Sequence, residues 1–584
     1  MIPRSCWARR SLAGTGLVTL CLALAACSEH GDTQDSAPPV DGDRPGPPWF
    51  QEVATPWGVD FVHSAGSERR FLFPEIVAGG VALFDYDQDG WLDIYLVQGG
   101  DGLVEPGALT GANRLYRNLG PVPMGAARFE DVTKESRTGD TGYGMGAACG
   151  DIDGDGDLDL YVTNVGANRL YRNDGDGSFT EIGAAAGVDH PGWGTSAAFL
   201  DHDGDGLLDL FVVNYVDWDG ATERECFSSS RDRVRSYCSP TVYGAPARDV
   251  LYRNLGDGTF EDVTESSGIG AAWGNGLGVA WGDFDGDKRP DIYVANDGTP
   301  NNLWVRGADG TFEDRALFLG CALGGQGQAE AGMGVVAADL EGDGDLDILL
   351  AHLRGEANTV YLQDRGQFMD RTGAVGLGAV SRSFTSFGLV LADLDGDGWR
   401  DIYAANGNVL REDPFYSPDR PYAEPNQVFR GSAEGRFREL LPRGGTRLES
   451  VEISRAAAAG DLDGDGDVDL VVVNTDAPVQ VLENIVGQQQ SWLGLRVIDA
   501  DGRDACDAEV HVVGGNIDVR RRVQMAYSYQ ASNDPRLQIG LADQAGPVQV
   551  TVRWPSGAQQ SFGDLAPGSY HVLRQDVAAG GGEK

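Results

Sequence analysis

Short apolar runs alternate with acidic turns along most of the chain. An apolar run rich in small residues, such as 79–84 or 277–282, precedes each acidic turn, and a β-rich run, such as 94–97 or 210–213, follows it. Apolar runs of four to eight residues bounded by turn residues are typical of buried strands. The pattern therefore predicts a repeating unit of strand, acidic turn and strand.

The acidic turn recurs seven times with one internal spacing, D-x-[DE]-x-D-x-x-x-D. Internal repetition of this kind is the sequence signature of a repeat architecture. A motif like LYRN follows each turn, and a motif like FEDVT comes after it in six of the seven units. A unit of four short strands joined by tight turns is the blade of a β-propeller. The acidic turns lie at 85–93, 151–159, 201–209, 283–291, 339–347, 393–401 and 461–469.

The seventh unit ends near residue 484 without a motif of the third kind, and the missing copy, FQEVA, lies at 50–54. We expect 50–54 to pair beside 479–482, which closes the ring and removes an open sheet edge. The expected fold is all-β: a seven-bladed propeller over 49–487 and a small β-sandwich-like domain over 488–575, followed by a disordered tail over 576–584.

The acidic turns have the spacing of a metal-binding loop. Positions 1, 3 and 5 are expected to supply carboxylates, position 7 a backbone carbonyl and position 9 a last carboxylate. These hard oxygen ligands favour Ca²⁺ over zinc or copper, and a flexible carboxylate-rich loop favours Ca²⁺ over Mg²⁺. The alternative is a set of solvated acidic turns without metal.

About seven calcium ions are thus expected, one per blade. The expected ligands are Asp85, Asp87, Asp89, Trp91 and Asp93; Asp151, Asp153, Asp155, Asp157 and Asp159; Asp201, Asp203, Asp205, Leu207 and Asp209; Asp283, Asp285, Asp287, Arg289 and Asp291; Asp339, Glu341, Asp343, Asp345 and Asp347; Asp393, Asp395, Asp397, Trp399 and Asp401; and Asp461, Asp463, Asp465, Asp467 and Asp469.

Two residues depart from the shared loop pattern. Glycine at position 6 permits the sharp turn in six copies, whereas the fourth copy has Lys288 there and is expected to bind metal more weakly. His202 occupies position 2 of the third copy, where a side chain is expected to point outward and not to be a ligand.

The negative charge of the chain supports the binding of cations by the loops. The 584 residues carry a formal net charge of −44, and the seven loops hold 31 of the 89 acidic residues. Such clusters repel themselves unless a cation is present, so metal binding is expected to be coupled to folding. The same negative charge argues against nucleic acid as a partner.

The N-terminus has the features of an export signal. A basic start with Arg4, Arg9 and Arg10 precedes a short apolar run, which ends in Leu-Ala-Ala-Cys at 24–27. This motif resembles a bacterial lipobox and implies cleavage after residue 26, lipidation of Cys27 and a tether over 27–48. An outer-membrane or cell-surface location then follows, and an ordinary signal peptide with a chance cysteine is the alternative.

Two insertions interrupt the repeats. The first, 217–249, holds Cys226 and Cys238, for which a disulfide is the natural expectation in an oxidising compartment. It also carries Arg231, Arg233 and Arg235, and the second insertion, 412–425, carries Phe415, Tyr416 and Tyr422. Insertions on propellers tend to line one face, where ligands bind, although solvated loops are the simpler interpretation.

Beyond single motifs, the repeats resemble FG-GAP/VCBS repeats, the architecture of integrin α-subunit propellers. The C-terminal stretch, with AEVHVVGG at 508–515, YSYQASNDPRLQIGL at 527–541 and VTVRWPSGAQQ at 550–560, looks like the ASPIC/UnbV domain of the cartilage acidic protein family. The resemblance implies extracellular, calcium-dependent roles with partners that differ between members.

The function is less constrained than the fold. The sequence contains no HExxH, GxSxG, Walker or SxxK motif, so the enzyme question stays open and leans towards no. A calcium-stabilised surface module for adhesion to or binding of a protein or glycan is the first hypothesis. The alternatives are an enzyme that uses the propeller mouth, such as a carbohydrate lyase, a hydrolase or a natural-product tailoring enzyme, and a structural envelope component.

Overall fold

The computed structural model describes residues 46–66, 70–100, 103, 111–123, 125–228, 233–411 and 419–576. All of them belong to one compact unit, which spans Pro45–Lys584. The expected signal peptide, the lipidated Cys27, most of the tether, and the side chains of Arg231, Phe415 and Tyr416 lie outside the described residues. So does all but the first residue of the C-terminal tail. No helix in the described part of the chain is long and apolar enough to cross a membrane.

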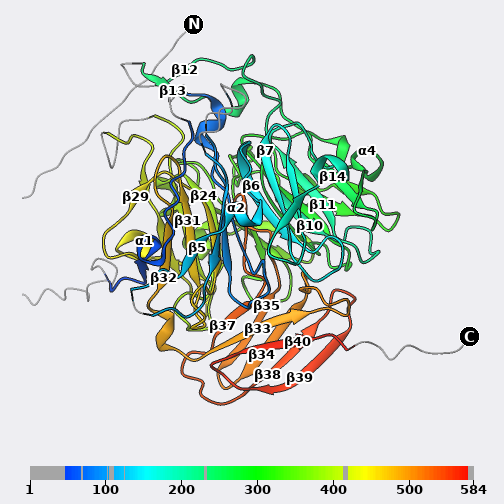
Figure 1. Ribbon diagram of the computed structural model, residues 1–584, viewed down its shortest axis with the longest axis vertical. Helices are drawn as coiled ribbons and strands as arrows, with labels where there is room; N and C mark the ends of the chain where they lie inside the picture. Colours follow the sequence, from blue (N-terminus) through cyan, green and yellow to red (C-terminus); the bar gives the residue numbers. More distant parts are fainter. Residues whose placement is uncertain are drawn as a thin grey trace, which may run out of the picture. The chain divides into compact units, whose positions relative to one another are not determined.

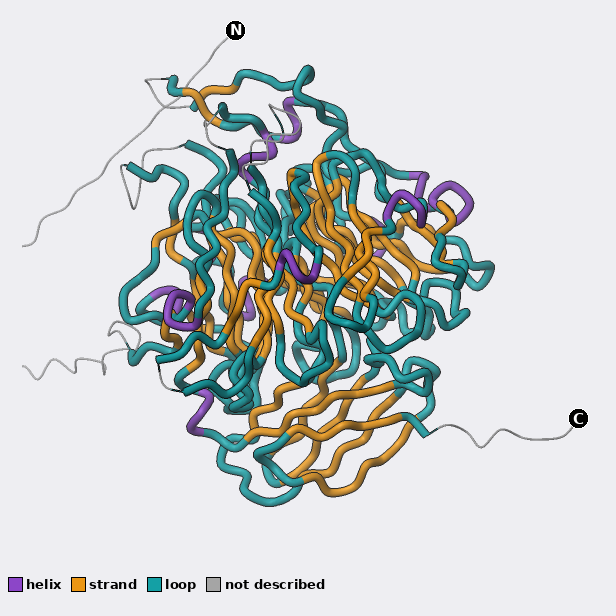
Figure 2. Tube along the Cα trace, viewed as in Figure 1, coloured by secondary structure: helices purple, strands orange, loops and turns teal. Residues whose placement is uncertain are grey.

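Seven sheets of one connectivity follow one another between residues 50 and 484 (Figures 1 and 2). We number them as blades 1 to 7 from the acidic turn that each contains. Their strands, from inner to outer, are β2 (Val81–Phe84), β3 (Asp93–Leu96), β4 (Arg114–Asn118) and β5 (Phe129–Asp131); β6 (Tyr143–Gly150), β7 (Asp159–Val165), β8 (Arg169–Asn173) and β9 (Phe179–Glu181); β10 (Gly194–Leu200), β11 (Asp209–Asn214), β14 (Val250–Asn254) and β15 (Phe260–Asp262); β16 (Gly276–Gly282), β17 (Asp291–Asn296), β18 (Asn302–Arg306) and β19 (Phe312–Asp314); β20 (Val335–Ala338), β21 (Asp347–Leu350), β22 (Thr359–Asp364) and β23 (Gln367–Asp370); β24 (Ser386–Ala392), β25 (Asp401–Asn406), β27 (Gln427–Arg430) and β28 (Arg438–Glu439); and β30 (Ser454–Gly460), β31 (Asp469–Asn474), β32 (Gln480–Asn484) and β1 (Phe50–Glu52).

Short helical turns and two small strand pairs lie in the connections between the strands. The one-turn helices follow outer strands, and the 3-10 turns lie in longer connections. They are α1 (Ala54–Trp57), α2 (Thr133–Ser136), α3 (Gly183–Ala186), α4 (Thr264–Ser267), α5 (Ala316–Leu319), α6 (Thr372–Val375), η1 (Phe73–Ile76), η2 (Pro240–Val242), η3 (Ile269–Ala271), η4 (Ser381–Ser383), η5 (Arg443–Gly445) and η6 (Gly487–Gln489), with the pairs β12 (Cys226–Phe227) with β13 (Arg235–Ser236) and β26 (Glu424–Pro425) with β29 (Val451–Glu452).

The inner strands form a closed ring. Each contacts the inner strand of the next blade, in the order β2, β6, β10, β16, β20, β24, β30 and back to β2. Small residues in these strands allow the close approach: a Cβ atom on Gly278 would lie 2.2 Å from the carbonyl oxygen of Met333, and one on Gly146 would lie 2.4 Å from that of Thr195. The apolar runs are therefore rich in glycine and alanine because neighbouring blades meet backbone to backbone.

The ring closes where the sequence predicted it. Strand β1 pairs antiparallel with β32, with Phe50 opposite Asn484 and Glu52 opposite Leu482. Phe50 is buried, and its ring meets that of Tyr403 in blade 6 at 6.1 Å. The N-terminal segment thus supplies the outer strand of the last blade, and the prediction of this pairing is confirmed.

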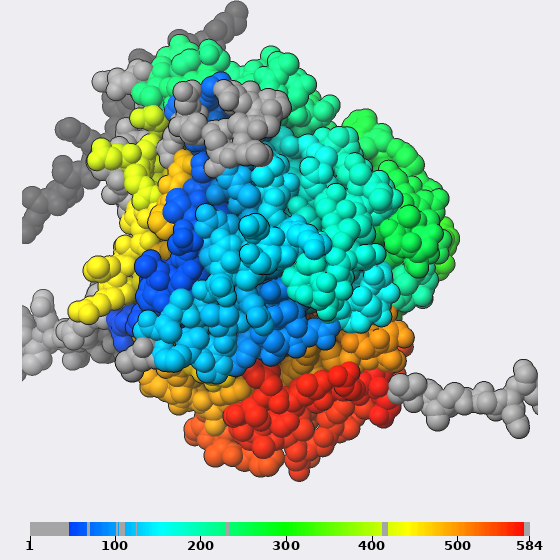
Figure 3. Space-filling model, viewed as in Figure 1, coloured from blue at the N-terminus to red at the C-terminus, as the bar shows by residue number. Residues whose placement is uncertain are grey.

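The C-terminal residues form a separate pair of sheets with a core of their own. One sheet has the order β37 (Leu537–Gly540), β33 (Trp492–Ile498) and β40 (Tyr570–Arg574); the other has β35 (Ile517–Arg522), β34 (Glu509–Gly514), β38 (Val548–Arg553) and β39 (Gln559–Leu565). Leu495, Val510, Val550 and Trp554 are among the buried residues between them. Figure 3 shows these residues, in orange and red, packed against the blue and cyan blades.

One segment of this domain, residues 525–534, leaves its sheets and enters the ring; we call it the central segment. Its short strand β36 (Ala531–Ser532) pairs parallel with β2 of blade 1. Ser528 exchanges backbone hydrogen bonds with Val335 of blade 5, and its hydroxyl donates to the carbonyl of Ala457 in blade 7 at 3.0 Å. The sequence did not predict that the second domain fills the centre of the first.

Tyr529 anchors the central segment. Its side chain is fully buried, its hydroxyl donates to the carbonyl of Val77 at 2.7 Å, and its ring lies 4.9 Å from that of Phe387. The guanidinium of Arg455 in turn stacks on Phe387 at 4.0 Å. These contacts join the central segment to the chain before blade 1 and to blade 6, and Arg455 extends them to blade 7.

The first insertion covers the other end of the ring. Cys226 and Cys238 form a disulfide within it. Glu223 accepts hydrogen bonds from the backbone of Phe73, from the indole of Trp218 and from the hydroxyl of Tyr243. The insertion is thereby fixed to the segment before blade 1.

Candidate metal centres

The first aspartate of each acidic loop shapes the turn. In blade 2, the two oxygens of Asp151 accept the backbone N–H groups of Gly154 at 2.7 Å and Gly156 at 3.1 Å. Gly156 has a φ of 93°, in the left-handed region that favours glycine. In blade 4, Lys288 makes the equivalent bond to Asp283 at 3.0 Å with a φ of 70°. Lys288 therefore adopts the same turn, but its left-handed backbone conformation costs conformational free energy that glycine avoids.

The last aspartate ties the loop to two strands. In blade 2, Asp159 accepts the N–H of Ile152 and the N–H of Asn173, both at 2.8 Å. The equivalent carboxylates in the other six blades make the same pair of bonds and are almost fully buried; they are Asp93, Asp209, Asp291, Asp347, Asp401 and Asp469. Position 9 is thus fixed by backbone hydrogen bonds in each loop.

Carboxylates at positions 1, 3 and 9 converge. In five loops, one oxygen from each lies within 4.8 Å of the other two: Asp85, Asp87 and Asp93; Asp151, Asp153 and Asp159; Asp201, Asp203 and Asp209; Asp283, Asp285 and Asp291; and Asp393, Asp395 and Asp401. Three carboxylates at this separation surround a volume that a single cation can occupy. The equivalent residues of blades 5 and 7 stay predicted ligands.

Position 5 makes a contact of its own within the loop. Its carboxylate is not among the converging oxygens of those five loops. Instead it accepts the N–H of position 7, as Asp155 does from Asp157 at 2.9 Å and Asp205 does from Leu207 at 2.9 Å. The side chain stabilises the exit of the turn, so a role for position 5 as ligand, and for the carbonyl of position 7, stays a prediction.

The converging carboxylates are electrostatically costly as anions. Burial, with a smaller effect of neighbouring loop carboxylates, raises the pKa of Asp159 to about 8 and that of Asp291 and Asp347 to about 7. Oxygens of Asp87, Asp393 and Asp395 are buried and have no hydrogen-bond partner among the described residues. A divalent cation at the centre of each cluster offsets the repulsion and supplies the missing partner, so the residues present fit calcium.

Arginines of the LYRN motif also reach the loops, which the sequence analysis missed. Arg117 pairs with Asp87 at 2.6 Å and Asp89 at 3.2 Å. Arg253 and Arg430 make the same contacts with positions 3 and 5 in blades 3 and 6. The recurrence of arginine at the third position of the LYRN-like motif was the signal that could have predicted these ion pairs with the loop carboxylates.

One expectation about the loops is wrong. His202 was expected to point outward from position 2, but it is 6% exposed, and its Nδ1 contacts the Oδ2 of Asp209. Its ring also stacks on Phe312 of blade 4, with centroids 6.3 Å apart. Position 2 faces the neighbouring blade because the loop lies between two blades, so the side chain packs there.

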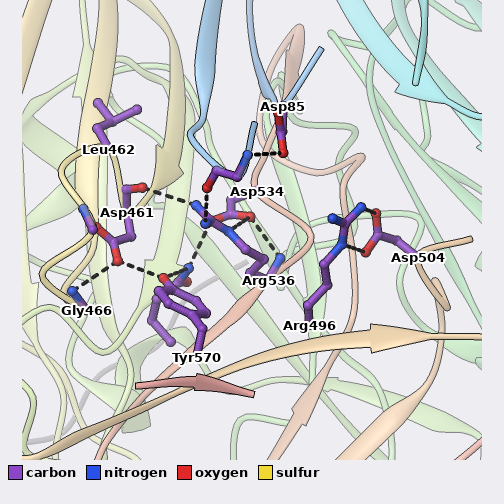
Figure 4. Close-up of polar contacts among 12 residues, drawn as sticks. Asp85, Asp461, Leu462, Gly466, Arg496, Asp504, Asp534, Arg536 and Tyr570 are labelled. Atoms are coloured by element: carbon purple, nitrogen blue, oxygen red, sulfur yellow. Dashed lines mark hydrogen bonds and ion pairs between the residues drawn. The ribbon is translucent and has the colours of Figure 1, made fainter. Parts of the chain in front are cut away.

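The C-terminal domain contacts loops of blades 1, 6 and 7, and Figure 4 shows the contacts at Asp461 of blade 7. In blade 1, the guanidinium of Arg536 donates to the carbonyl of Gly90 at 3.4 Å. The hydroxyl of Tyr570 donates to the Oδ2 of Asp461 at 2.7 Å, and the guanidinium of Arg536 donates to the carbonyl of Asp461 at 3.1 Å. The backbone N–H of Gly540 donates to Asp393 at 3.1 Å. The acidic loops of these blades and the C-terminal domain therefore share one face of the ring.

Known families match both parts of the chain. The FG-GAP-like repeat family matches residues 85–162, 151–212, 241–294, 283–350 and 342–404, and the ASPIC and UnbV family matches residues 499–580.

Among curated proteins, cartilage acidic protein 1 of Homo sapiens is 28% identical over 276 residues, which cover 46% of this chain and 39% of the human protein. That of Mus musculus is 25% identical over 279 residues, with 47% and 38% covered. The chain spans about two fifths of the length of the curated relatives that it matches.

Among solved structures, an Agrocybe aegerita lectin described as recognising non-reducing terminal N-acetylglucosamine aligns with a TM-score of 0.37 and 17% identity. The alignment covers 69% of this chain and 86% of the lectin.

Proposed function

The chain belongs to the FG-GAP repeat proteins that end in an ASPIC/UnbV domain, and we propose that it is an exported, lipid-anchored, calcium-binding module that binds a protein or a glycan at the cell surface. The observation that carries the proposal is the set of converging carboxylates at positions 1, 3 and 9, repeated from blade to blade. Calcium in these clusters would hold each loop between its strands and stabilise the ring outside the cell.

The face opposite the metal loops supports a binding role. The C-terminal domain occupies the loop face, so the disulfide-bonded insertion presents the surface that is left for a partner. This insertion is fixed by Glu223, yet it exposes apolar side chains: Phe227 is 46% and Val242 is 49% exposed. Exposed apolar residues on a well-anchored loop are typical of an interaction site.

A binding assay tests this role. We expect the calcium-loaded chain, made unlipidated by Cys27→Ala, to bind saturably to an array of defined glycans or to intact cells of the source organism. Phe227→Ala with Val242→Ala should weaken this binding about tenfold, and chelation should abolish it. Phe318→Ala is the matched control, because Phe318 is 71% exposed on α5 at the outside of blade 4. Equal binding by the double variant and the unsubstituted chain contradicts the proposed face.

The lipid anchor has a separate test. The basic start, the short apolar run and the Leu-Ala-Ala-Cys motif at 24–27 support lipidation of Cys27. Cells that express the chain with radioactive palmitate should yield a labelled protein in the membrane fraction. Cys27→Ala should remove both the label and the membrane association, and a labelled Cys27→Ala chain contradicts the assignment.

A propeller-based enzyme is the second candidate, and one group of residues favours it. The hydroxyl of Tyr215 donates to Asp297 at 2.5 Å, burial raises the pKa of Asp297 to about 6, and His352 lies 3.7 Å from Glu356. A carbohydrate lyase, hydrolase or tailoring enzyme would use such acid–base groups. His352 is only 1% exposed, however, which favours the binding role. His352→Ala should therefore leave the binding of the partner unchanged.

A further inference from the structure

A cavity lies between blades 5 to 7 and the C-terminal domain, with a volume of about 90 Å³. The space comes from both domains: β20, β24 and β30 supply apolar wall residues, and the C-terminal domain supplies polar ones. Its charged lining residues are four arginines and two aspartates: Arg400, Arg521, Arg522, Arg536, Asp393 and Asp534. Cationic groups therefore outnumber anionic groups around it.

Two of the arginines already have carboxylate partners. Arg536 pairs with Asp534 at 2.9 Å, as Figure 4 shows, and Arg522 pairs with Asp507. Their charges are balanced within the C-terminal domain. These two side chains line the cavity, but their positive charges are already compensated by Asp534 and Asp507.

The other two arginines have only backbone partners. Arg400 of blade 6 donates to the carbonyl of Asp339 at 2.8 Å and to that of Arg520 at 3.3 Å. Arg521 donates to the carbonyls of Arg520 and Gly398, both at 2.9 Å. Neither forms an ion pair with a carboxylate of the described residues, and two bonds use only two of the five N–H groups of each guanidinium.

The arrangement favours an anion in the cavity. Arg400 and Arg521 are half-buried and line one cavity, where Asp393 is the carboxylate closest in effect to Arg521. Two neighbouring cations are stabilised when an anion accepts hydrogen bonds from both. Tyr527 and Gln524 also line the cavity and bring neutral donors.

We propose that this cavity binds one small oxyanion, of the size of sulfate, between Arg400 of the propeller and Arg521 of the C-terminal domain. A single water-sized site needs roughly 10–15 Å³ of such volume, so the cavity has room for a tetrahedral ion. Because one arginine comes from each domain, the ion also joins the C-terminal domain to the ring. This inference does not depend on the surface partner.

Calorimetric titration of the calcium-loaded chain with sodium sulfate, at constant ionic strength in chloride, tests the proposal. We expect one sulfate per chain, and at least about tenfold weaker binding in Arg521→Gln and in Arg400→Gln. Arg553→Gln is the matched control, because Arg553 lies on β38 of the same domain, pairs with Glu509 and does not line the cavity. Its sulfate affinity should equal that of the unsubstituted chain.

A second arm and a folding check make each outcome decisive. A sulfated monosaccharide, titrated in parallel, distinguishes a free ion from a sulfate group carried on a sugar. Loss of the binding heat of either ligand in Arg521→Gln supports the site. The ligand with the lower dissociation constant is then the preferred one. Melting curves with and without sulfate test the same site by a second measurement. Sulfate should raise the melting temperature of Arg553→Gln but not that of Arg521→Gln. The absence of saturable binding to the unsubstituted chain, or equal binding by Arg521→Gln and Arg400→Gln, overturns the proposal.

Discussion

Asn118 donates its side-chain amide to the backbone carbonyl of Leu462, 2.8 Å away and 344 positions later in the chain. Asn118 ends the LYRN motif of blade 1, and Leu462 is the second residue of the metal loop of blade 7. The same bond joins other neighbouring blades, from Asn173 to Tyr86 and from Asn254 to Ile152, both at 2.8 Å. The repeat therefore provides a hydrogen bond from the asparagine of one blade to the acidic loop of the preceding blade. The same bond is present between blades 1 and 7, where the ring closes.

Removal of the seam bond should destabilise the ring at one place. Asn118→Ala leaves the buried carbonyl of Leu462 without its partner, and we expect a loss of about 1–3 kcal/mol in the free energy of unfolding. Hydrogen exchange should rise first in β1, β2 and β32, because blades contact mainly their neighbours. Asn173→Ala, which removes the same bond between blades 1 and 2, is the control. Exchange that rises equally in all blades contradicts the account of the seam.

The pH dependence of stability should differ between the calcium-free and calcium-loaded forms. Burial raises the pKa of Asp159 from 3.8 to about 8, and that of Asp291 and Asp347 to about 7. In the calcium-free chain, these acids stabilise the folded state at low pH, and that contribution is lost as the pH rises from about 4 through about 8. The melting temperature in chelator should therefore fall between pH 5 and pH 8.

Calcium replaces the protons on these carboxylates, so the loaded form should lose much less over the same range. The gap between the two melting temperatures thus widens as the pH rises. Parallel curves with and without calcium would mean that the loop carboxylates do not hold the metal.

Replacement of Lys288 by glycine should stabilise blade 4. Lys288 has a φ of 70° at position 6, where the other loops have glycine, and relief of this conformation is worth about 1 kcal/mol. We expect Lys288→Gly to raise the melting temperature and the calcium affinity of the fourth loop. Gln88→Gly is the control: Gln88 has a φ of 56°, but its side chain donates to Asp157 and to the carbonyl of Gly156, which its removal forfeits. A Lys288→Gly chain that is no more stable contradicts the backbone argument.

Substitution of Tyr529 should separate the contribution of its hydrogen bond from the contribution of its packing in the central segment. Tyr529→Phe removes one buried hydrogen bond to Val77, for a loss of about 1 kcal/mol. Tyr529→Ala also leaves a cavity beside Phe387, for a loss of about 3–5 kcal/mol. Chemical denaturation measures both. If Tyr529→Ala costs no more than Tyr529→Phe, the segment does not hold the ring together.

The repeat is the part of the structure that could be predicted from the sequence. A fixed spacing within each unit places the acidic loops between two strands, and a count of third motifs placed 50–54 at the seam, where β1 pairs with β32. Local chemistry determined these features, because each unit repeats the same hydrogen bonds.

The rest depends on contacts between units or between domains. His202 is buried because blade 4 lies beside its loop, and Phe312, its neighbour there, is 110 positions away in the sequence. The central segment occurs once, so no repetition marks it, and its partners Val77, Val335 and Ala457 come from three distant parts of the chain. The cationic cavity likewise exists only where Arg400 and Arg521 are brought together.

Elemental analysis of bound calcium tests the central claim most directly. The purified chain, dialysed against calcium and then against metal-free buffer, should retain about seven calcium ions per chain, one for each loop. Asp151→Asn with Asp159→Asn should lower that number by one, and the loss should be confined to blade 2. One retained ion or none, or an unchanged number in the double variant, would contradict the account.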